Sequence, residues 1–200
     1  MTVRRVGARS AGTREQIVVA ARAVMAERGC GAITYRAVAG KAGCAPGLVQ
    51  YHFSDLDALL AAVIDAGTEQ AIARLSELAE QTRPLHSLWR HSTDPASTAL
   101  FGQLMELAAH RPTVGEALAR GGQRVRAALI TMVERSWPDA PLPDLPLTPA
   151  ALVFTLTAIP HMLHMERAYG ATLAHPETIT FIESLLDRLE PEAPEHEQHT

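Results

Sequence analysis

Apolar residues recur every three or four positions along most of the chain, a spacing that predicts helices and not strands. In the first such segment, Ile17, Ala21 and Val24 fall on one face. No stretch alternates in the way that a half-buried strand requires, and an all-α fold is therefore expected. The pattern predicts helices over residues 13–28, 34–42, 46–53, 55–83, 96–110, 112–137, 148–170 and 176–189, and residues 85–94 stay unassigned.

Capping residues and prolines set the predicted boundaries of these helices. Thr13 and Gln16 have the spacing of a capping box, and Gly29 follows Arg28 as a stop signal. Pro160 predicts a kink or a break in the helix over 148–170. Four prolines predict a stiff connector over 138–146, and the acidic tail from Pro191 is expected to be disordered.

Composition narrows the class of protein. Aromatic residues make up 4% of the 200 residues, and alanine and leucine dominate, which favours helix. Two cysteines, Cys30 and Cys44, are too few for a disulfide framework or a zinc ribbon and suit a reducing compartment. The start lacks the pattern of a secretory signal, and the uncharged stretch 145–165 is too rich in proline to predict a membrane span. A cytoplasmic protein with no membrane partner is expected.

Charge is distributed unevenly along the chain, whose formal net charge is −4. Residues 1–53 contain eight Lys and Arg against two acids, a balance of +6, whereas residues 54–200 contain ten Arg against twenty acids, a balance of −10. A basic amino-terminal quarter on an acidic body is typical of a protein that binds a polyanion with one end.

The basic quarter also contains a helix-turn-helix pattern. A short helix with Val38, Ala39 and Ala42 inward ends at Gly43, and a second short helix with Val49 and Phe53 inward follows Pro46. Two short helices joined by a glycine-containing turn are typical of DNA-binding domains.

The segments Thr34–Gly43 (TYRAVAGKAG), Pro46–Phe53 (PGLVQYHF) and Asp57–Leu60 (DALL) resemble the DNA-binding domain of TetR/AcrR-family transcriptional regulators. The resemblance covers residues 13–60, and beyond them only length and helical character agree. It implies an all-α homodimer whose larger carboxy-terminal domain binds a small molecule and whose last two long helices form a four-helix dimer interface. It also implies repression that the ligand relieves, with no cofactor; an activator of the same fold is the alternative.

This organisation predicts four segments: a flexible basic arm at 1–12, a helix-turn-helix domain at 13–55, a helical ligand-binding and dimerisation domain at 56–190, and a disordered tail at 191–200. Two recognition helices related by a twofold axis would read an inverted-repeat operator in double-stranded DNA.

The outward positions of the second short helix are candidates for base contacts. Gln50 suits adenine, and Leu48 suits a thymine methyl group. Arg36 matches a family position that reaches a base or phosphate, and guanine is its expected target. Thr34 and Tyr51 have structural alternatives, because Thr34 could serve only as a cap and Tyr51 could pack against the first helix. The full set of expected DNA contacts is Thr34, Tyr35, Arg36, Lys41, Ala45, Pro46, Gly47, Leu48, Gln50, Tyr51 and His52.

Two positions depart from the family pattern. Gln50 stands where the family commonly has an aromatic residue, and Leu56 stands where it commonly has a phosphate-binding lysine. Arg4, Arg5 and Arg9 are candidates to compensate by lying along the minor groove; the alternative is a disordered arm.

Candidate pocket and interface residues come from the carboxy-terminal helices. The expected ligand-binding residues, for which plain core packing is the alternative, are Trp89, Phe101, Leu104, Met105, Met132, Phe154, His161 and Met162. The expected dimer interface, for which core packing is again the alternative, comprises Leu152, Leu156, Ile179, Ile182, Leu185, Leu186 and Leu189. His161 and His164 lack a third partner, so no metal site is predicted.

Other functional classes have weaker support in the sequence. The chain has no phosphate-binding glycine loop, no H-E-x-x-H and no G-x-S-x-G motif, and an enzyme is not expected. A helical adaptor whose basic end binds an acidic protein is the remaining alternative, and competition by duplex DNA would distinguish it from a regulator.

Overall fold

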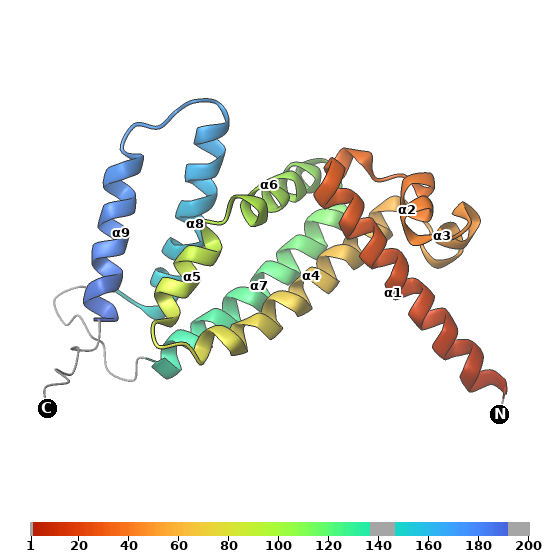
Figure 1. Cartoon of the computed structure of the whole chain (residues 1–200), viewed down its shortest axis with the longest axis horizontal. Coiled ribbons are helices and arrows are strands. Elements are labelled where there is room, and N and C mark those ends of the chain that lie inside the picture. Colours follow the sequence, from red (N-terminus) through yellow and green to blue (C-terminus); the bar gives the residue numbers. More distant parts are fainter. Residues whose placement is uncertain (1, 137–146, 192–200) are drawn as a thin grey trace, which may run out of the picture. The chain divides into compact units, whose positions relative to one another are not determined.

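A computed structural model describes residues 2–136 and 147–191 of the chain (Figure 1). Every regular element in these residues is helical, which confirms the predicted all-α fold class. The elements are α1 (Thr2–Arg28), the 3-10 helix η1 (Cys30–Ala32), α2 (Tyr35–Ala42), α3 (Pro46–His52), α4 (Leu56–Ala79), α5 (Pro84–Ser92), α6 (Pro95–His110), α7 (Pro112–Ser136), α8 (Pro149–Ala168) and α9 (His175–Leu189).

The helices form two compact units. The first unit comprises Met1–Ala73 and Ala99–Val125, and the second comprises Arg74–Thr98 and Arg126–Thr200. The division falls within α4 and within α7, so each of these helices contributes residues to both units.

A single hydrophobic core holds the first unit together. The buried face of α1, represented by Ile17 and Met25, packs in one cluster with Val38 of α2 and Val49 of α3. The same cluster continues through Leu59 of α4 into α6 and α7, where its buried members are Leu104, Val114 and Ala117. The amino-terminal helices α1, α2 and α3 therefore share their core with α4, α6 and α7 and are not an independent layer.

Capping side chains begin several helices where the sequence predicts them to begin. The Thr34 side chain accepts a hydrogen bond from the Ala37 N–H at 3.1 Å and starts α2, and Thr148 accepts one from the Ala151 N–H at the same distance and starts α8. Asp55 caps α4 by accepting a hydrogen bond from the Ala58 N–H at 2.7 Å. Pro112 begins α7, as predicted.

The first helix starts earlier than predicted. α1 begins at Thr2 and not at Thr13, so the capping-box pattern at Thr13 lies inside a helix. Residues 2–12 contain no proline, and nothing in them forces the helix to stop. The two glycines in this stretch, Gly7 and Gly12, are tolerated within the helix at a modest entropic cost.

The second unit contains a helix that the sequence pattern did not resolve. α5 spans Pro84–Ser92, packs against α8 and α9, and buries Leu85, Leu88 and Trp89. Its first backbone N–H groups have no capping residue in their own sequence. The carboxylate of Glu190, at the end of α9, accepts hydrogen bonds from the N–H groups of Leu85 and His86 at 2.8 and 3.1 Å.

Pro160 does not interrupt its helix. α8 continues from Pro149 to Ala168, with the buried Pro160 ring inside it. The predicted connector at 138–146 and the predicted tail beyond Pro191 lie outside the described residues. Within the described ranges, each helix is too short or too polar to cross a lipid bilayer.

Candidate nucleic-acid interface

The geometry of α2 and α3 follows from three residues in the turn that joins them. Gly43 ends α2 in the left-handed conformation, with φ of +66°, which glycine adopts without a steric penalty. The Cys44 N–H closes the turn by donating to the Ala39 carbonyl at 3.0 Å. Ala45 is extended, and Pro46 occupies the first turn of α3, where its missing N–H costs nothing. The result is a helix-turn-helix unit, as predicted.

Burial fixes which face of α3 is free. Val49 and Phe53 are buried in the core of the first unit, as predicted. The remaining side of the helix faces solvent: Ala45, Pro46, Gly47, Leu48 and Gln50 are exposed, and His52 is half-buried. α3 therefore presents the predicted set of side chains on one accessible face.

Tyr51 also belongs to this accessible face. Its side chain is 80% exposed, so it does not pack against α1. Its ring makes an edge-to-face contact with His52, with ring centroids 5.2 Å apart. The phenol hydroxyl is thus available at the surface beside Gln50.

The predicted contact residues of α2 differ in their surroundings. Thr34 is exposed and caps the helix, so its hydroxyl already accepts one hydrogen bond. Tyr35 packs partly against the core, whereas Arg36 is exposed. Lys41 forms an ion pair with Glu27 of α1, with Nζ and Oε1 2.5 Å apart, so part of its charge is compensated inside the chain.

Two basic side chains of α1 are held in different ways. The Arg22 guanidinium donates a hydrogen bond to Gln70 of α4. Arg14 of α1 lies over the ring of Phe53, with Cζ 4.8 Å from the ring centroid. The sequence reasoning did not single out Arg14, because only the fold brings residue 14 next to the end of α3.

The expected ligand-binding residues do not gather around one cavity. Leu104 belongs to the core of the first unit, and Met105 is exposed. Phe154 and Met162 are also exposed, and His161 bonds to the Thr157 carbonyl of its own helix through Nδ1 at 2.5 Å. Their role as ligand contacts stays a prediction, as does that of the half-buried Phe101.

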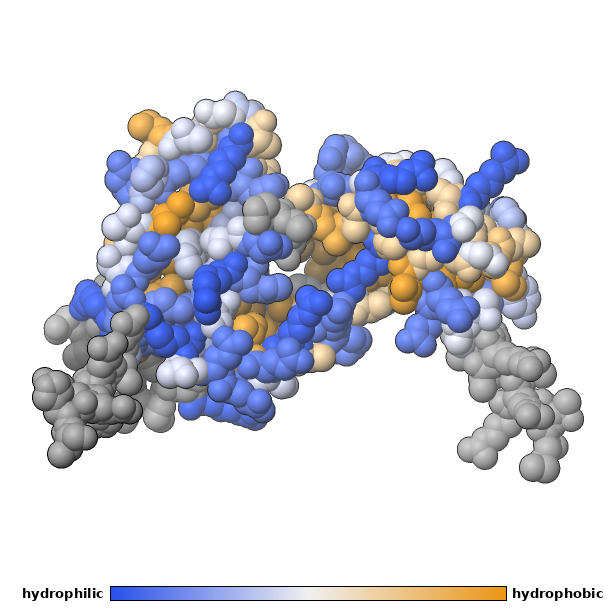
Figure 2. All heavy atoms as spheres, viewed as in Figure 1, coloured by the Kyte–Doolittle hydropathy of each residue, from blue (hydrophilic) through white to orange (hydrophobic). Residues whose placement is uncertain are grey.

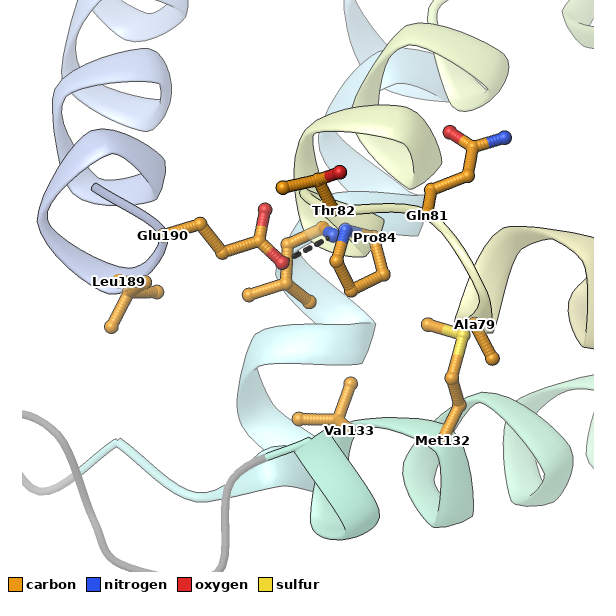
Figure 3. A pocket seen from close by; sticks show the side chains of 9 residues that line it. Ala79, Gln81, Thr82, Pro84, Met132, Val133, Leu189 and Glu190 are labelled. Carbon is orange, nitrogen blue, oxygen red and sulfur yellow. Dashed lines mark hydrogen bonds between the residues drawn. The ribbon is translucent and has the colours of Figure 1, made fainter. Parts of the chain in front are cut away.

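Among the described residues of the second unit, two cavities are each lined by one of the predicted ligand-binding residues. The first, of about 320 Å³, is lined by Met132 of α7 together with Leu85 of α5 and the Glu190 carboxylate, whose hydrogen bond to the Leu85 N–H crosses it (Figure 3). The second, of about 210 Å³, is lined by Trp89 of α5 with residues of α8 and α9. The polar side chains that line this second cavity are Thr93, His164, Arg167 and Glu183.

The residues expected at a dimer interface are mostly core residues of the single chain. Ile179 is half-buried and lines the second cavity. The other six are buried within one chain: Leu152, Leu156, Ile182, Leu185, Leu186 and Leu189. Leu152, Leu156, Ile182 and Leu186 have no accessible surface in the single chain, which favours core packing, the alternative, whereas Leu185 and Leu189 are 8% and 7% exposed. A role of these six residues at a dimer interface stays a prediction.

A different set of apolar side chains reaches the surface of α8. Phe154, Met162, Met165 and Tyr169 are each at least half exposed, and their spacing of three, four or eight residues places them on one face. Phe181 of α9 is exposed as well. Hydrophobic residues likewise show in patches among hydrophilic ones in the space-filling view (Figure 2). The sequence of α8 contains this apolar spacing and also a second, more strongly apolar face that includes Leu152 and Leu156. Periodicity alone does not tell which of the two faces packs against the core.

The described residues contain no group of three or more potential metal ligands. Cys30 and Cys44 are free thiols, and burial raises the pKa of Cys30, with the nearby Glu106 acting in the same direction. A raised pKa keeps this thiol protonated and unreactive at neutral pH.

Comparisons with known proteins agree with this geometry. Residues 17–63 match the family model described as bacterial regulatory proteins, tetR family. A search of curated proteins found no match.

Solved structures match over most of the chain. Salmonella enterica GusR has 21% identity and a TM-score of 0.64, with 90% of this chain and 95% of that one covered. A protein from Mesorhizobium loti assigned to the TetR family of transcriptional regulators has 18% identity, a TM-score of 0.68 and the same two coverages. The transcriptional regulator FadR from Bacillus subtilis, solved in complex with stearoyl-CoA, has 18% identity and a TM-score of 0.58, with 88% and 97% covered.

The family match covers α2, α3, the carboxy-terminal part of α1 and the start of α4, and the structural likeness covers 90% of the chain. Residues 17–63 thus match the tetR family of bacterial regulatory proteins, and the chain shares its fold with solved structures that include a TetR-family protein from Mesorhizobium loti.

Proposed function

We propose that this chain is a cytoplasmic, DNA-binding transcriptional regulator that acts by binding and not by turnover. The observation that carries the proposal is the accessible face of α3, which presents Leu48, Gln50 and Tyr51 while Val49 and Phe53 anchor the helix in the core. A short, rigidly held helix with one polar, exposed face suits the major groove of duplex DNA. The surplus of positive charge in residues 1–53 favours the same partner.

The residues divide into those that read bases and those that contact phosphates. Gln50 can pair with adenine through two hydrogen bonds, Leu48 can touch a thymine methyl group, and Arg36 can pair with guanine. We assign phosphate contacts to Thr34, Tyr35, Lys41, Tyr51 and His52. Lys41 would exchange its ion pair with Glu27 for a phosphate oxygen.

The regulator acts as a homodimer on an inverted repeat, because two recognition helices related by a twofold axis double the base contacts and fix the spacing of the half-sites. We assign the interface to the exposed face of α8, because most of the residues expected from the sequence are buried within the single chain. We define the α8 stripe as Ala151, Phe154, Ala158, Met162, Met165 and Tyr169, which recur every three or four positions. An apolar stripe with this spacing is typical of a helix face that packs against another helix.

A small, hydrophobic ligand releases the repressor from its operator. The two cavities of the second unit are open to such a ligand, and each is lined in part by apolar side chains such as Met132 or Trp89. FadR, with the same fold, was solved with the acyl ligand stearoyl-CoA. We place the ligand-binding and dimerisation domain at 56–190 and the helix-turn-helix domain at 13–55.

Selection of bound duplexes from a random pool tests the proposal directly. A palindromic consensus is the expected result, since it shows sequence reading and twofold symmetry together. An acidic-protein adaptor would yield no consensus, and any weak binding would vanish at physiological salt. A reporter gene placed behind the selected sequence then shows the sign of regulation, and lower expression in the presence of the protein is expected.

A further inference from the structure

The contact between Arg14 and Phe53 brings a cation from α1 to the carboxy-terminal end of α3. Arg14 is exposed, and its guanidinium carbon lies 4.8 Å from the centre of the Phe53 ring. Phe53 directly follows His52, the last residue of α3, and its ring is buried in the core. Arg14, which is 39 positions away in the sequence, therefore lies at the carboxy-terminal end of the recognition helix.

The ring holds the guanidinium in place without neutralising it. A cation over an aromatic face is attracted by the ring quadrupole, and the planar guanidinium keeps donors at its edges for a further partner. Within the described residues Arg14 makes no ion pair, whereas the charge of Lys41 is compensated by Glu27 at 2.5 Å. Arg14 is thus a positive charge that is already oriented and does not have to give up a carboxylate before it binds an anion.

The size of α3 and the side of it on which Phe53 lies indicate which part of the DNA the Arg14 guanidinium would contact. The seven residues of α3 make a helix about 10 Å long. The major groove is about 12 Å wide, and a sugar-phosphate backbone borders it on each side. When the exposed face of α3 lies in the groove, Phe53 is on the opposite side of the helix, so a cation over its ring lies away from the base edges and on the side of the bordering phosphates.

We propose that Arg14 is a phosphate-contacting residue of the DNA interface, oriented by its stacking on Phe53. The inference rests on the proposed function and deepens it, because it adds a contact from α1 that carries affinity but no sequence information. In a dimer each protomer contributes one such contact, on the outer phosphates of its own half-site.

The test is the salt dependence of DNA binding by the full chain, measured by fluorescence anisotropy on the selected operator and on a random duplex of equal length. Arg14→Met keeps an apolar side chain over the Phe53 ring but removes the charge. A lost phosphate contact lowers the slope of log K against log salt by about 0.9 per protomer, or about 1.8 for a dimer on two half-sites. The loss is expected to be equal on operator and random duplex.

Two further variants separate this role from general electrostatics and from folding. Arg28→Met removes an exposed cation about 21 Å further along α1, since 14 residues at 1.5 Å separate the two positions, and should leave the slope nearly unchanged. Arg14→Lys keeps the charge and should retain most of the slope. Circular dichroism should show unchanged helix content for all three, because the substituted side chains are exposed.

The failure of this inference differs from the failure of the proposed function. If the wild type binds duplexes and Arg14→Met has the wild-type slope, Arg14 does not contact phosphate and the inference is overturned. If Arg14→Met weakens the operator alone, Arg14 reads a base and the inference is equally wrong. If the wild type binds no duplex in dilute buffer, the proposed function itself is wrong.

Discussion

The basic side chains near the helix-turn-helix unit have different surroundings, and these surroundings decide how much of each positive charge is available to DNA. Arg36 is exposed, Lys41 faces Glu27, and Arg14 stacks on Phe53. The sequence predicted that Arg36 and Lys41 are near DNA, because both lie in the family motif. It could not show the ion pair of Lys41 or the stacking of Arg14, since both depend on α1 packing against α2 and α3.

Gln50 offers a residue-scale test of base reading. Replacing Gln50 by Ala removes two hydrogen bonds to an adenine and should weaken operator binding by about 1–3 kcal/mol for each base contact. Binding to a random duplex should change little, because no phosphate contact is lost. Titrations of both duplexes at one salt concentration check this. An equal loss on both duplexes would mean that Gln50 contacts the backbone instead.

Helix boundaries show what the sequence can predict at the scale of the element. The starts of α2, α7 and α8 were predicted because Thr34, Pro112 and Thr148 act within their own turn. α5 was missed because the acceptors for its first N–H groups come from Glu190, more than a hundred residues away. Pro84 in the first turn is the local signal at the start of α5, but no capping side chain accompanies it in the neighbouring sequence.

The cap of α4 makes stability depend on pH in a predictable direction. The hydrogen bond from the Ala58 N–H, with help from the Ser54 hydroxyl, lowers the pKa of Asp55. Since the pKa is lower in the folded than in the unfolded chain, the carboxylate stabilises the fold above the unfolded value of about 3.9. That contribution is lost as the pH falls through the folded value.

Asp55→Asn isolates this contribution, because the amide oxygen still accepts a hydrogen bond but carries no charge. The variant should be slightly less stable than the wild type at neutral pH, and the difference should shrink on acidification to around pH 3. Urea midpoints at the two pH values measure it. The effect is small because the carboxylate is exposed to solvent. A difference that grows on acidification would contradict the assignment.

The crossing of α4 and α7 depends on a glycine at the point of contact. A Cβ at Gly121 would clash with the Oγ1 atom of Thr68, which is buried and donates to the Ile64 carbonyl at 2.9 Å. Gly121→Ala should therefore destabilise the fold by about 1–3 kcal/mol through overpacking. Urea denaturation followed by circular dichroism gives the value.

The adjacent Gly122 supplies the control. A Cβ at Gly122 meets nothing within 4 Å, so Gly122→Ala should stabilise the helix by about 0.5–1 kcal/mol. The two substitutions are chemically identical and one position apart on the same helix. Equal changes in the free energy of unfolding for the two variants would show that helix propensity, and not the contact with α4, determines the effect at Gly121.

At the scale of the whole molecule, the sequence predicted the apolar faces of α8 and α9. It did not show whether each face packs against other helices of the same chain or against a second copy. Leu156 and Ile182 belong to the more regular apolar pattern, and they fill the core of the second unit. Met162 and Phe154, predicted to contact a ligand, are exposed on the α8 stripe. Hydrophobic periodicity predicts that a face is buried against something, and only the fold shows whether that partner lies within the same chain.

This distinction makes the dimer interface testable with a matched pair of substitutions on one helix. Met162→Glu places a charge on the α8 stripe, where dimerisation would bury it without a partner, at a cost of at least about 3 kcal/mol. The expected product is a folded monomer with a dimer dissociation constant more than 100-fold higher. Its operator affinity should fall as well, because the two half-sites are no longer bound by one particle.

Leu156→Glu is the counterpart in the core of α8. Leu156 has no exposed surface, so a glutamate there should unfold the second unit whatever the oligomeric state. Sedimentation velocity reports the mass of each variant, and circular dichroism reports its helix content. A Met162→Glu variant that stays folded and dimeric at wild-type affinity would remove the α8 stripe from the interface and place the contact between copies on another surface.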